Sequence, residues 1–143
     1  MEKKIVQVQE RTQQLIRQLL NVWESSVRAT HDFLSEEEII KIREYVPMAI
    51  ENVEYLIIAE KEFGEPVAFM GIDSNRLEML FLSPEVRGKG FGKQLLQYGI
   101  ETYNIQELTV NEQNPQAVGF YEHMGFQTYK RTEYDEEGNP YPL

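Results

Sequence analysis

The sequence has no cysteine and only two histidines, His31 and His123, among its 143 residues. Without cysteine, disulfide bonds, thiolate nucleophiles and cysteine-ligated metal sites are all excluded. The two histidines follow no familiar spacing of metal ligands, so a histidine-rich metal site is not expected either. The sequence therefore predicts chemistry that uses no metal and no thiol of its own.

Long apolar runs are also missing. The first residues, MEKKIVQVQERTQQ, lack the apolar core of a signal peptide, and no stretch approaches the roughly 20 apolar residues of a membrane span. These absences predict a cytoplasmic protein with no membrane partner. Basic residues are outnumbered, and the formal net charge of −10 argues against nucleic acid as the main partner. The acidity is compatible with a cationic substrate such as an amine.

The remaining composition is that of an ordinary globular protein, with 41% hydrophobic and 27% charged residues over the usual length of one domain. We expect a single domain over residues 1–143. Hydrophobic periodicity predicts strands at 3–9, 54–61, 65–73, 76–83, 107–112 and 126–134, and helices at 10–30, 35–46, 90–103 and 114–124. This order indicates a mixed α/β fold, an antiparallel meander followed by helical crossovers.

Local signals mark several helix ends. Ser35 and Glu38 have the spacing of a capping box at the start of the second predicted helix, and Pro47 disrupts that helix. Asn114 suits the N-cap of the last predicted helix. Gly125 suits the position just beyond its C-terminus, where a left-handed backbone is common.

The stretch PEVRGKGFGKQLL, residues 84–96, gathers glycines and cations between a predicted strand and a predicted helix. The first amides of a helix have no internal partners, and the helix dipole adds positive potential there. Glycine lets the backbone approach an anion closely. The pattern predicts a phosphate site formed by Arg87, Gly88, Lys89, Gly90, Phe91, Gly92 and Lys93.

Two nucleotide motifs do not fit this stretch. A Walker A loop needs a glycine at position 87 and Ser or Thr after the lysine, but the chain has Arg87 and Gln94. A dinucleotide fingerprint needs a third glycine where Lys93 stands. The simpler alternative to an anion site is a turn and a helix start with solvated lysines.

The arrangement Arg87-x-x-Gly90-x-Gly92 after an apolar strand resembles the acetyl-CoA loop of the GNAT superfamily of N-acetyltransferases. A second block, NEQNPQAVGFYEHMGF at 111–126, resembles that family's Asn, Ala, Phe-Tyr and Gly-Phe segment. The stretches SSVRATHDFLSEEE and NPYPL further resemble the YjaB-like group of bacterial acetyltransferases. The resemblance covers nearly the whole chain.

The resemblance implies a mostly antiparallel central sheet flanked by helices on both faces. In it the strands near 76–83 and 107–112 form a parallel pair. It also implies acetyl-CoA as the acetyl donor, with its pyrophosphate on the amides of residues 87–92. The pantetheine arm would pair with backbone groups of Leu80, Phe81 and Leu82, and Asn114 would contact its end. Asn114 as a plain N-cap is the local alternative.

Catalytic roles also follow from the resemblance. Tyr121 matches the tyrosine that protonates the leaving thiolate, with core packing as its alternative. The glutamate that some relatives carry five residues before the asparagine is Thr109 here, which leaves the base open. Glu78, the acid within the apolar run LEMLFL, is a candidate base that would act through water, with a charge near a strand end as its alternative.

His31 and Asp32 fall where the family's first two helices border the acceptor site. The resemblance implies an N-acetyltransferase, monomeric or homodimeric, that acts on a primary amine of a small molecule, peptide or protein. A non-catalytic acyl-CoA-binding or regulatory domain is the alternative. The family's final strand is expected around NPYPL, of which only Tyr141 to Leu143 remain after the turn, so the last strand is expected to be incomplete.

Overall fold

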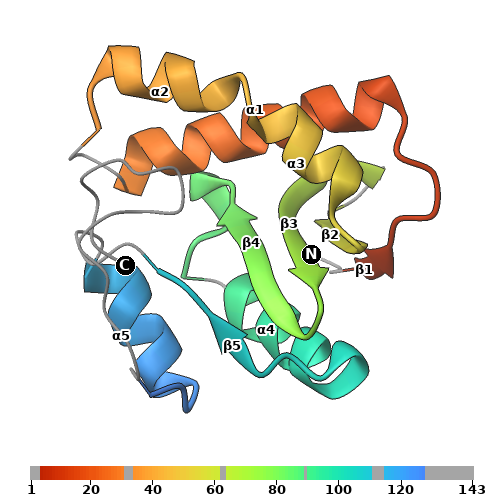
Figure 1. Cartoon of the computed structure of the whole chain (residues 1–143), viewed down its shortest axis with the longest axis vertical. Coiled ribbons are helices and arrows are strands. Elements are labelled where there is room, and N and C mark those ends of the chain that lie inside the picture. The colour runs from red at the N-terminus through yellow and green to blue at the C-terminus, as the bar shows by residue number, and fades with distance from the viewer. Residues whose placement is uncertain (1–3, 31–33, 62–63, 89, 111–114, 128–143) are drawn as a thin grey trace. The chain divides into compact units, whose positions relative to one another are not determined.

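The computed structural model describes residues 4–30, 34–61, 64–88, 90–110 and 115–127 (Figure 1). The chain divides into two compact units, Met1–Gln106 and Glu107–Leu143, and each unit is described by itself. The expectation of a single domain over residues 1–143 stays a prediction.

An antiparallel sheet forms the centre of the first unit. Its strands lie in sequence order: β1 (Lys4–Gln7), β2 (Tyr55–Glu60), β3 (Pro66–Asp73) and β4 (Arg76–Leu82). Only Ser74 and Asn75 separate β3 from β4, and both have positive φ, 51° and 65°. Two left-handed residues give the turn whose twist matches that of the flanking strands. The predicted meander is confirmed.

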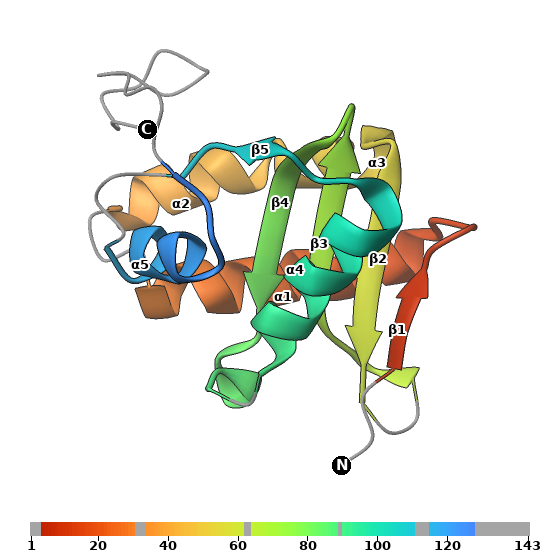
Figure 2. The same cartoon turned by 90° about the horizontal axis from the view of Figure 1, so that it is seen from below.

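Helices cover both faces of this sheet (Figure 2). One face carries α1 (Gln13–Thr30), α2 (Glu36–Arg43) and α3 (Val46–Asn52); the other carries α4 (Phe91–Tyr103). Helices α1 and α4 each pack against β3 and β4. Because β3 is covered from both sides, every residue from Pro66 to Ile72 is buried. The expected mixed α/β class with helices on both faces is confirmed.

The helix starts follow the local signals closely. Thr12 Oγ1 accepts a hydrogen bond from the Leu15 amide at 3.1 Å, so α1 begins at Gln13 and not at residue 10. The predicted capping box of α2 is present: the Glu38 amide donates to Ser35 Oγ at 3.2 Å, and Glu38 Oε1 accepts from the Ser35 amide at 2.9 Å.

The joint between α2 and α3 comes from Pro47. Proline has no amide to donate to the carbonyl four residues back, so α2 ends at Arg43 and α3 starts at Val46. The interruption of the second predicted helix at Pro47 is confirmed. The end of α3 is closed by Arg11, whose guanidinium donates to the carbonyl oxygens of Ile50, Glu51 and Glu54 at 2.8–3.2 Å.

After α4 the chain returns to the end of the sheet where β4 begins. The Gln106 amide donates to the carbonyl of Asn75, the residue before β4, at 2.8 Å. The Asn75 side chain donates in turn to the carbonyls of Tyr103 and Asn104 at 3.2 and 3.1 Å. These hydrogen bonds bring the end of the first unit back to the start of β4.

The second unit contains β5 (Glu107–Leu108) and α5 (Pro115–His123). Strand β5 is shorter than the predicted 107–112, since Thr109 and Val110 are not in strand; propensity alone does not supply ladder hydrogen bonds. Of the strand expected at 126–134, only the first two residues are described. The rest of it, the chain end and the Asn114 cap lie outside the described residues.

Candidate active site

A β-bulge lies at Glu78. Gly71 of β3 pairs with Met79 and Ile72 pairs with Leu77, so Glu78 is the extra residue that the register shift leaves between them. Regular alternation along the strand would place Glu78 on the same face as Leu80 and Leu82, but the bulge interrupts that alternation. A bulge bends its strand and redirects the side chain, and bulges are frequent beside active sites.

The Glu78 carboxylate is exposed, and its neighbour is a cation. Arg76 Nε lies 3.5 Å from Glu78 Oε1, with 28% of the Arg76 side chain and 36% of the Glu78 side chain accessible. Glu78 therefore presents a carboxylate that water can reach, which is what a base acting through water requires.

Past the bulge, β4 is regular. Leu80, Phe81 and Leu82 pair with Met70, Phe69 and Ala68 of β3, and all three are half-buried. In such a ladder, half of the backbone groups of a strand point toward its partner and half point away. The expected pairing with a pantetheine arm would use the backbone groups that point away from β3.

A short 3₁₀ turn, η2 (Pro84–Val86), connects β4 to the glycine loop. Lys61 ties this turn to the end of β2, with Nζ 3.2 Å from Glu85 Oε1 and 3.3 Å from Glu65 Oε2. These hydrogen bonds, that to Glu85 first, raise the pKa of Lys61 above its ordinary value. The lysine thus stays charged and holds the segment that leads into the loop.

The loop ends in an uncapped helix start. Gly90 is the N-cap of α4 with φ 83°, no side chain caps the helix, and its first turn has no acidic residue. A left-handed backbone at this point strongly favours glycine. Arg87 and Lys93 are exposed beside it, whereas Phe91 is buried and can offer an anion only its amide. This arrangement fits a phosphate group. Lys89 lies outside the described residues.

Tyr121 belongs to the second unit, on α5. Its ring is half-buried and meets Phe120 and Phe126 edge-on, with centroids 5.2 and 6.1 Å apart. Burial raises the pKa of Tyr121 to about 12. The phenol therefore remains a hydrogen-bond donor at neutral pH.

The end of α5 fixes the backbone at Tyr121. Phe126 donates its amide to the Tyr121 carbonyl, and Gly125 donates to the Glu122 carbonyl, both at 3.0 Å. Gly125 has φ 101°, as predicted for the residue beyond this helix. Together with the contact between the Tyr121 and Phe126 rings, these bonds form a Schellman motif.

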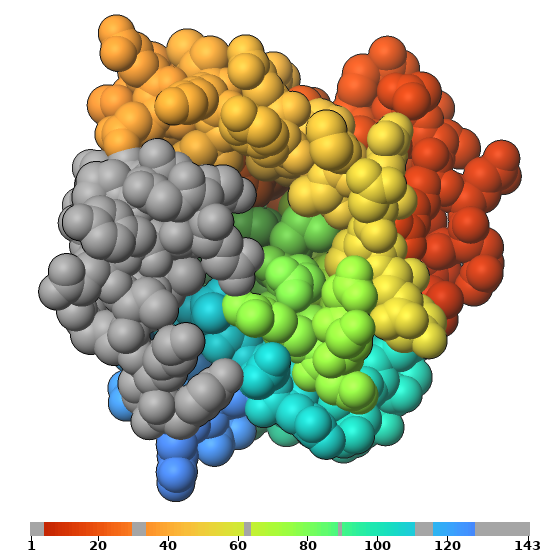
Figure 3. Space-filling model, in the orientation of Figure 1, coloured from red at the N-terminus to blue at the C-terminus, as the bar shows by residue number. Residues whose placement is uncertain are grey.

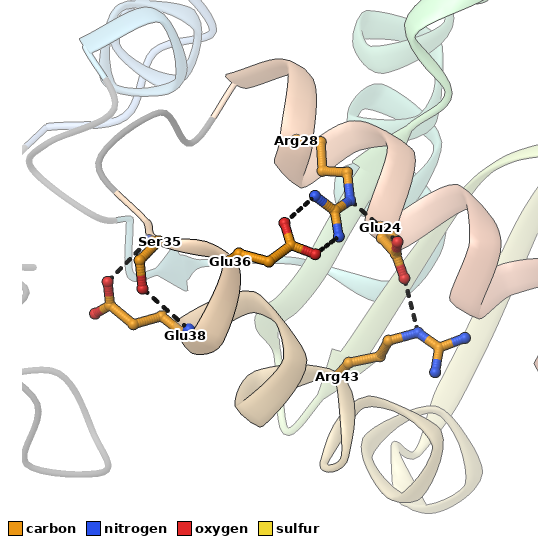
Figure 4. A network of polar contacts seen from close by, with 6 residues as sticks. All are labelled: Glu24, Arg28, Ser35, Glu36, Glu38 and Arg43. Carbon is orange, nitrogen blue, oxygen red and sulfur yellow. Dashed lines mark hydrogen bonds and ion pairs between the residues drawn. The ribbon is translucent and has the colours of Figure 1, made fainter.

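Of the other predicted site residues, His31, Asp32 and Asn114 lie outside the described residues. The described ends that flank residues 31–33 are joined by charged groups of α1 and α2 (Figure 4). Arg28 makes two hydrogen bonds to Glu36, at 2.6 and 2.7 Å, and a third to Glu24 at 3.0 Å. Glu24 also pairs with Arg43 at 2.7 Å. The bonds from Arg28 lower the pKa of Glu36, so the pair stays ionised.

Sequence reasoning missed the bulge, because it depends on the register with β3, and with it the approach of Arg76 to Glu78; it also missed the ion network between α1 and α2. Of these features, only the ion network was indicated by the sequence, because Arg28 and Glu36 carry opposite charges at adjoining helix ends. Within the part of the chain that the structure describes, no group of three His, Asp or Glu residues could hold a metal ion. The described helices include none that is long and apolar enough to cross a membrane.

Comparison with known proteins gives consistent results. Residues 7–141 match the family described as Acetyltransferase (GNAT) domain. The chain is 42% identical over 125 residues to the peptidyl-lysine N-acetyltransferase YjaB of Salmonella typhimurium, covering 87% of this chain and 86% of that protein.

Solved structures agree with this match. The solution structure of apo-form YjaB from Escherichia coli superposes with a TM-score of 0.88 at 36% identity, covering 99% of this chain and 94% of that one. The PaiA N-acetyltransferase of Thermoplasma acidophilum, solved in complex with coenzyme A, shares the fold with a TM-score of 0.73. It is 23% identical, and the match covers 99% of this chain and 97% of that one.

Proposed function

Because the chain belongs to the GNAT family of acetyltransferases, we propose that it transfers the acetyl group of acetyl-CoA to the side-chain amine of a lysine in a peptide or protein. The family resemblance and the acetyl-CoA-dependent N-acetyltransferase activity expected from the sequence are confirmed. The observation that carries the lysine acceptor is the 42% identity to a peptidyl-lysine N-acetyltransferase over 87% of the chain.

The start of α4 holds the acetyl donor. Its uncapped amides, reached through Gly88 and Gly90, would bind the pyrophosphate, and Arg87 and Lys93 would add charge at the rim. An added Cβ at Gly88 would meet no atom within 4 Å, so the space beside the backbone is open. The backbone of Leu80 to Leu82 would orient the pantetheine arm.

The acceptor amine has to lose a proton before it attacks. A lysine amine, with an ordinary pKa of about 10.4, is mostly protonated at neutral pH. In the proposal Glu78 takes that proton through water; the nitrogen–carbon bond forms and the carbon–sulfur bond breaks. Glu78→Gln should lower kcat most on the acidic side of the pH profile. An unchanged profile would leave ordered water as the base.

Tyr121 assists the departing sulfur. Its phenol, with a pKa of about 12, is a weaker acid than a thiol of about 8.5, so hydrogen bonding to the thiolate is the larger part of its contribution. Any proton that it gives is replaced from water. Since the pKa is raised, this donor is retained as pH increases and is lost only as pH approaches 12.

The test of the function is acetyl-CoA turnover with a lysine-containing peptide, with Nα-acetyl-lysine and with a peptide whose only amine is at its N-terminus. We expect turnover with the first two and little with the third. Acetyl-CoA binding without turnover on any amine would support a non-catalytic acyl-CoA-binding domain. Turnover with the α-amine alone would overturn the lysine acceptor.

Tyr121→Phe tests the acid. The ring and its contacts with Phe120 and Phe126 remain, so the melting temperature and CoA affinity should change little, while kcat should fall roughly 10²-fold. Tyr103→Phe is the matched control, because Tyr103 also has a pKa of about 12 and its hydroxyl donates to Gln7. The control should retain its kcat. Equal kcat losses in both variants would return Tyr121 to a packing role.

A further inference from the structure

The outer surface of α2 and α3 carries exposed apolar side chains. Among the residues that the structure describes, the large hydrophobics that are exposed are Ile40, Tyr45 and Met48, with 53%, 57% and 58% of their surface accessible. All three lie within nine consecutive residues. Single exposed apolar residues are common on proteins, but this concentration on one segment indicates an interaction surface.

The helical geometry places Ile40 and Met48 on one side, whereas Tyr45, five residues after Ile40, lies about 140° from it around the helix. Glu44 and Tyr45, at the joint, keep right-handed helical dihedrals, so the helical turn continues from α2 into α3. Ile40, Glu44 and Met48 follow at intervals of four, which aligns them along the segment. The buried residues of the same segment, Ile39, Val46 and Ile50, fall on the opposite side. Figure 3 shows α2 and α3 at the surface of the molecule.

Acidic residues accompany the apolar ones. Glu37, Glu44 and Glu51 are exposed at positions that share this side of the helical turn, against one exposed lysine, Lys41. The arginines nearby do not offset them, because Arg28 and Arg43 are engaged with Glu24 and Glu36. The α2–α3 outer face, defined by Ile40, Met48, Glu37, Glu44 and Glu51, is thus apolar and negatively charged, with Tyr45 exposed beside it.

We propose that the α2–α3 outer face docks a basic, partly apolar segment of the acceptor protein, outside the site where the lysine is acetylated. The inference rests on the proposed function. Charge complementarity selects this occupant: a second copy of the chain would bring six carboxylates together, and an anionic membrane would also be repelled. A lysine-rich segment supplies both the opposite charge and long apolar stems for Ile40 and Met48.

Side-chain hydrogen bonds hold both ends of this segment. Arg28 links the last turn of α1 to the start of α2 through two hydrogen bonds to Glu36 (Figure 4). The Arg11 guanidinium donates to carbonyls at the end of α3. A face held at both ends loses little conformational freedom when a partner docks.

The experiment compares three acceptors: a peptide with one lysine between arginine and leucine residues, the same peptide with glutamate in place of arginine, and Nα-acetyl-lysine. The variants are Glu44→Lys and the double variant Ile40→Ser with Met48→Ser. Glu44→Lys suits the C-terminus of α2, so it should not destabilise the helix. Glu101→Lys, the same change at an exposed position on α4, is the matched control.

We expect wild-type kcat/KM to favour the basic over the acidic peptide by roughly tenfold. Glu44→Lys should lower kcat/KM for the basic peptide about threefold, and the double variant roughly tenfold. Nα-acetyl-lysine and the Glu101→Lys control should stay within about twofold of wild type. Fluorescence polarisation of the labelled basic peptide repeats the comparison without turnover.

Equal kcat/KM for the two peptides, or equal losses with Nα-acetyl-lysine, would overturn the docking face. The proposal would also be overturned if the wild-type protein sedimented as a dimer and the double variant as a monomer, because a second copy would then occupy the face. These results are distinct from failure of the proposed function, in which wild-type protein acetylates no lysine at all while peptide binding can still be measured.

Discussion

Two helix starts in the same unit are built in opposite ways. Helix α2 is closed by its own side chains: Ser35 and Glu38 form a capping box, and all three residues of its first turn are acidic. Helix α4 starts at Gly90 with a left-handed backbone, no side-chain cap and no acid in its first turn. Lys93 occupies the third helical position, where α2 has Glu38.

The difference separates structural from ligand-binding helix starts. A capping box satisfies the orphan amides and adds negative charge next to them, which leaves nothing for an anion. At α4 the amides are left to an external partner, and the nearby charge is positive. In our proposal the open start of α4 and its nearby positive charge serve the pyrophosphate of acetyl-CoA.

The largest effect is expected from Gly90→Val. A β-branched residue strongly disfavours φ 83°, so the turn must shift and the amides of α4 lose their alignment. Calorimetry should show CoA affinity reduced more than 100-fold, while the melting curve still reports a folded protein. Gly119→Ala, where an added Cβ would meet no atom within 4 Å, should bind CoA as wild type does. Normal CoA binding by Gly90→Val would refute the loop assignment.

A smaller effect should follow when α4 is made to resemble α2. Lys93→Glu places an acid at the position of Glu38 and reverses one charge beside the pyrophosphate. We expect CoA affinity to fall roughly tenfold, and the deficit to shrink as salt screens the repulsion. Lys41→Glu, the same reversal on α2, should leave CoA affinity unchanged. Equal losses in the two variants would indicate a general effect of net charge.

The smallest effect should come from removing the N-cap side chain of α2. Ser35→Ala removes the side-chain oxygen that accepts the Glu38 amide and should lower the free energy of unfolding by about 1 kcal/mol. Urea unfolding measures this, with Ser25→Ala at an exposed position of α1 as the control. CoA affinity should be unaffected in both. A loss of CoA affinity in Ser35→Ala would show that the two helix starts are coupled.

Local chemistry made much of this fold predictable. The capping box at Ser35, the break at Pro47 and the left-handed Gly125 each depend on residues within a few positions, and each is found as predicted. The glycine loop was predictable for the same reason, because the turn and helix start are adjacent in sequence.

Features that need distant partners were not predictable. The bulge at Glu78 exists only in register with Gly71, and the Arg11 cap reaches carbonyls of α3 that are far along the chain. The roles of Tyr121, Glu78 and Asn114 came from the family resemblance, and they remain proposals. No periodicity in the sequence distinguishes a catalytic tyrosine from one that packs edge-on against Phe126.

The Arg11 cap has a consequence for the order in which the protein folds. Its partners lie 39 to 43 residues later in the chain, and β1 finds its place only against β2, from Lys4 opposite Glu60 to Gln7 opposite Ile57. During synthesis about fifty residues must therefore emerge before the Arg11 contacts can begin to form, and about sixty before β1 can pair fully with β2. Contacts of such high sequence separation require loop closure first and slow folding. In refolding, amide protection of β1 should accordingly appear no earlier than that of β2.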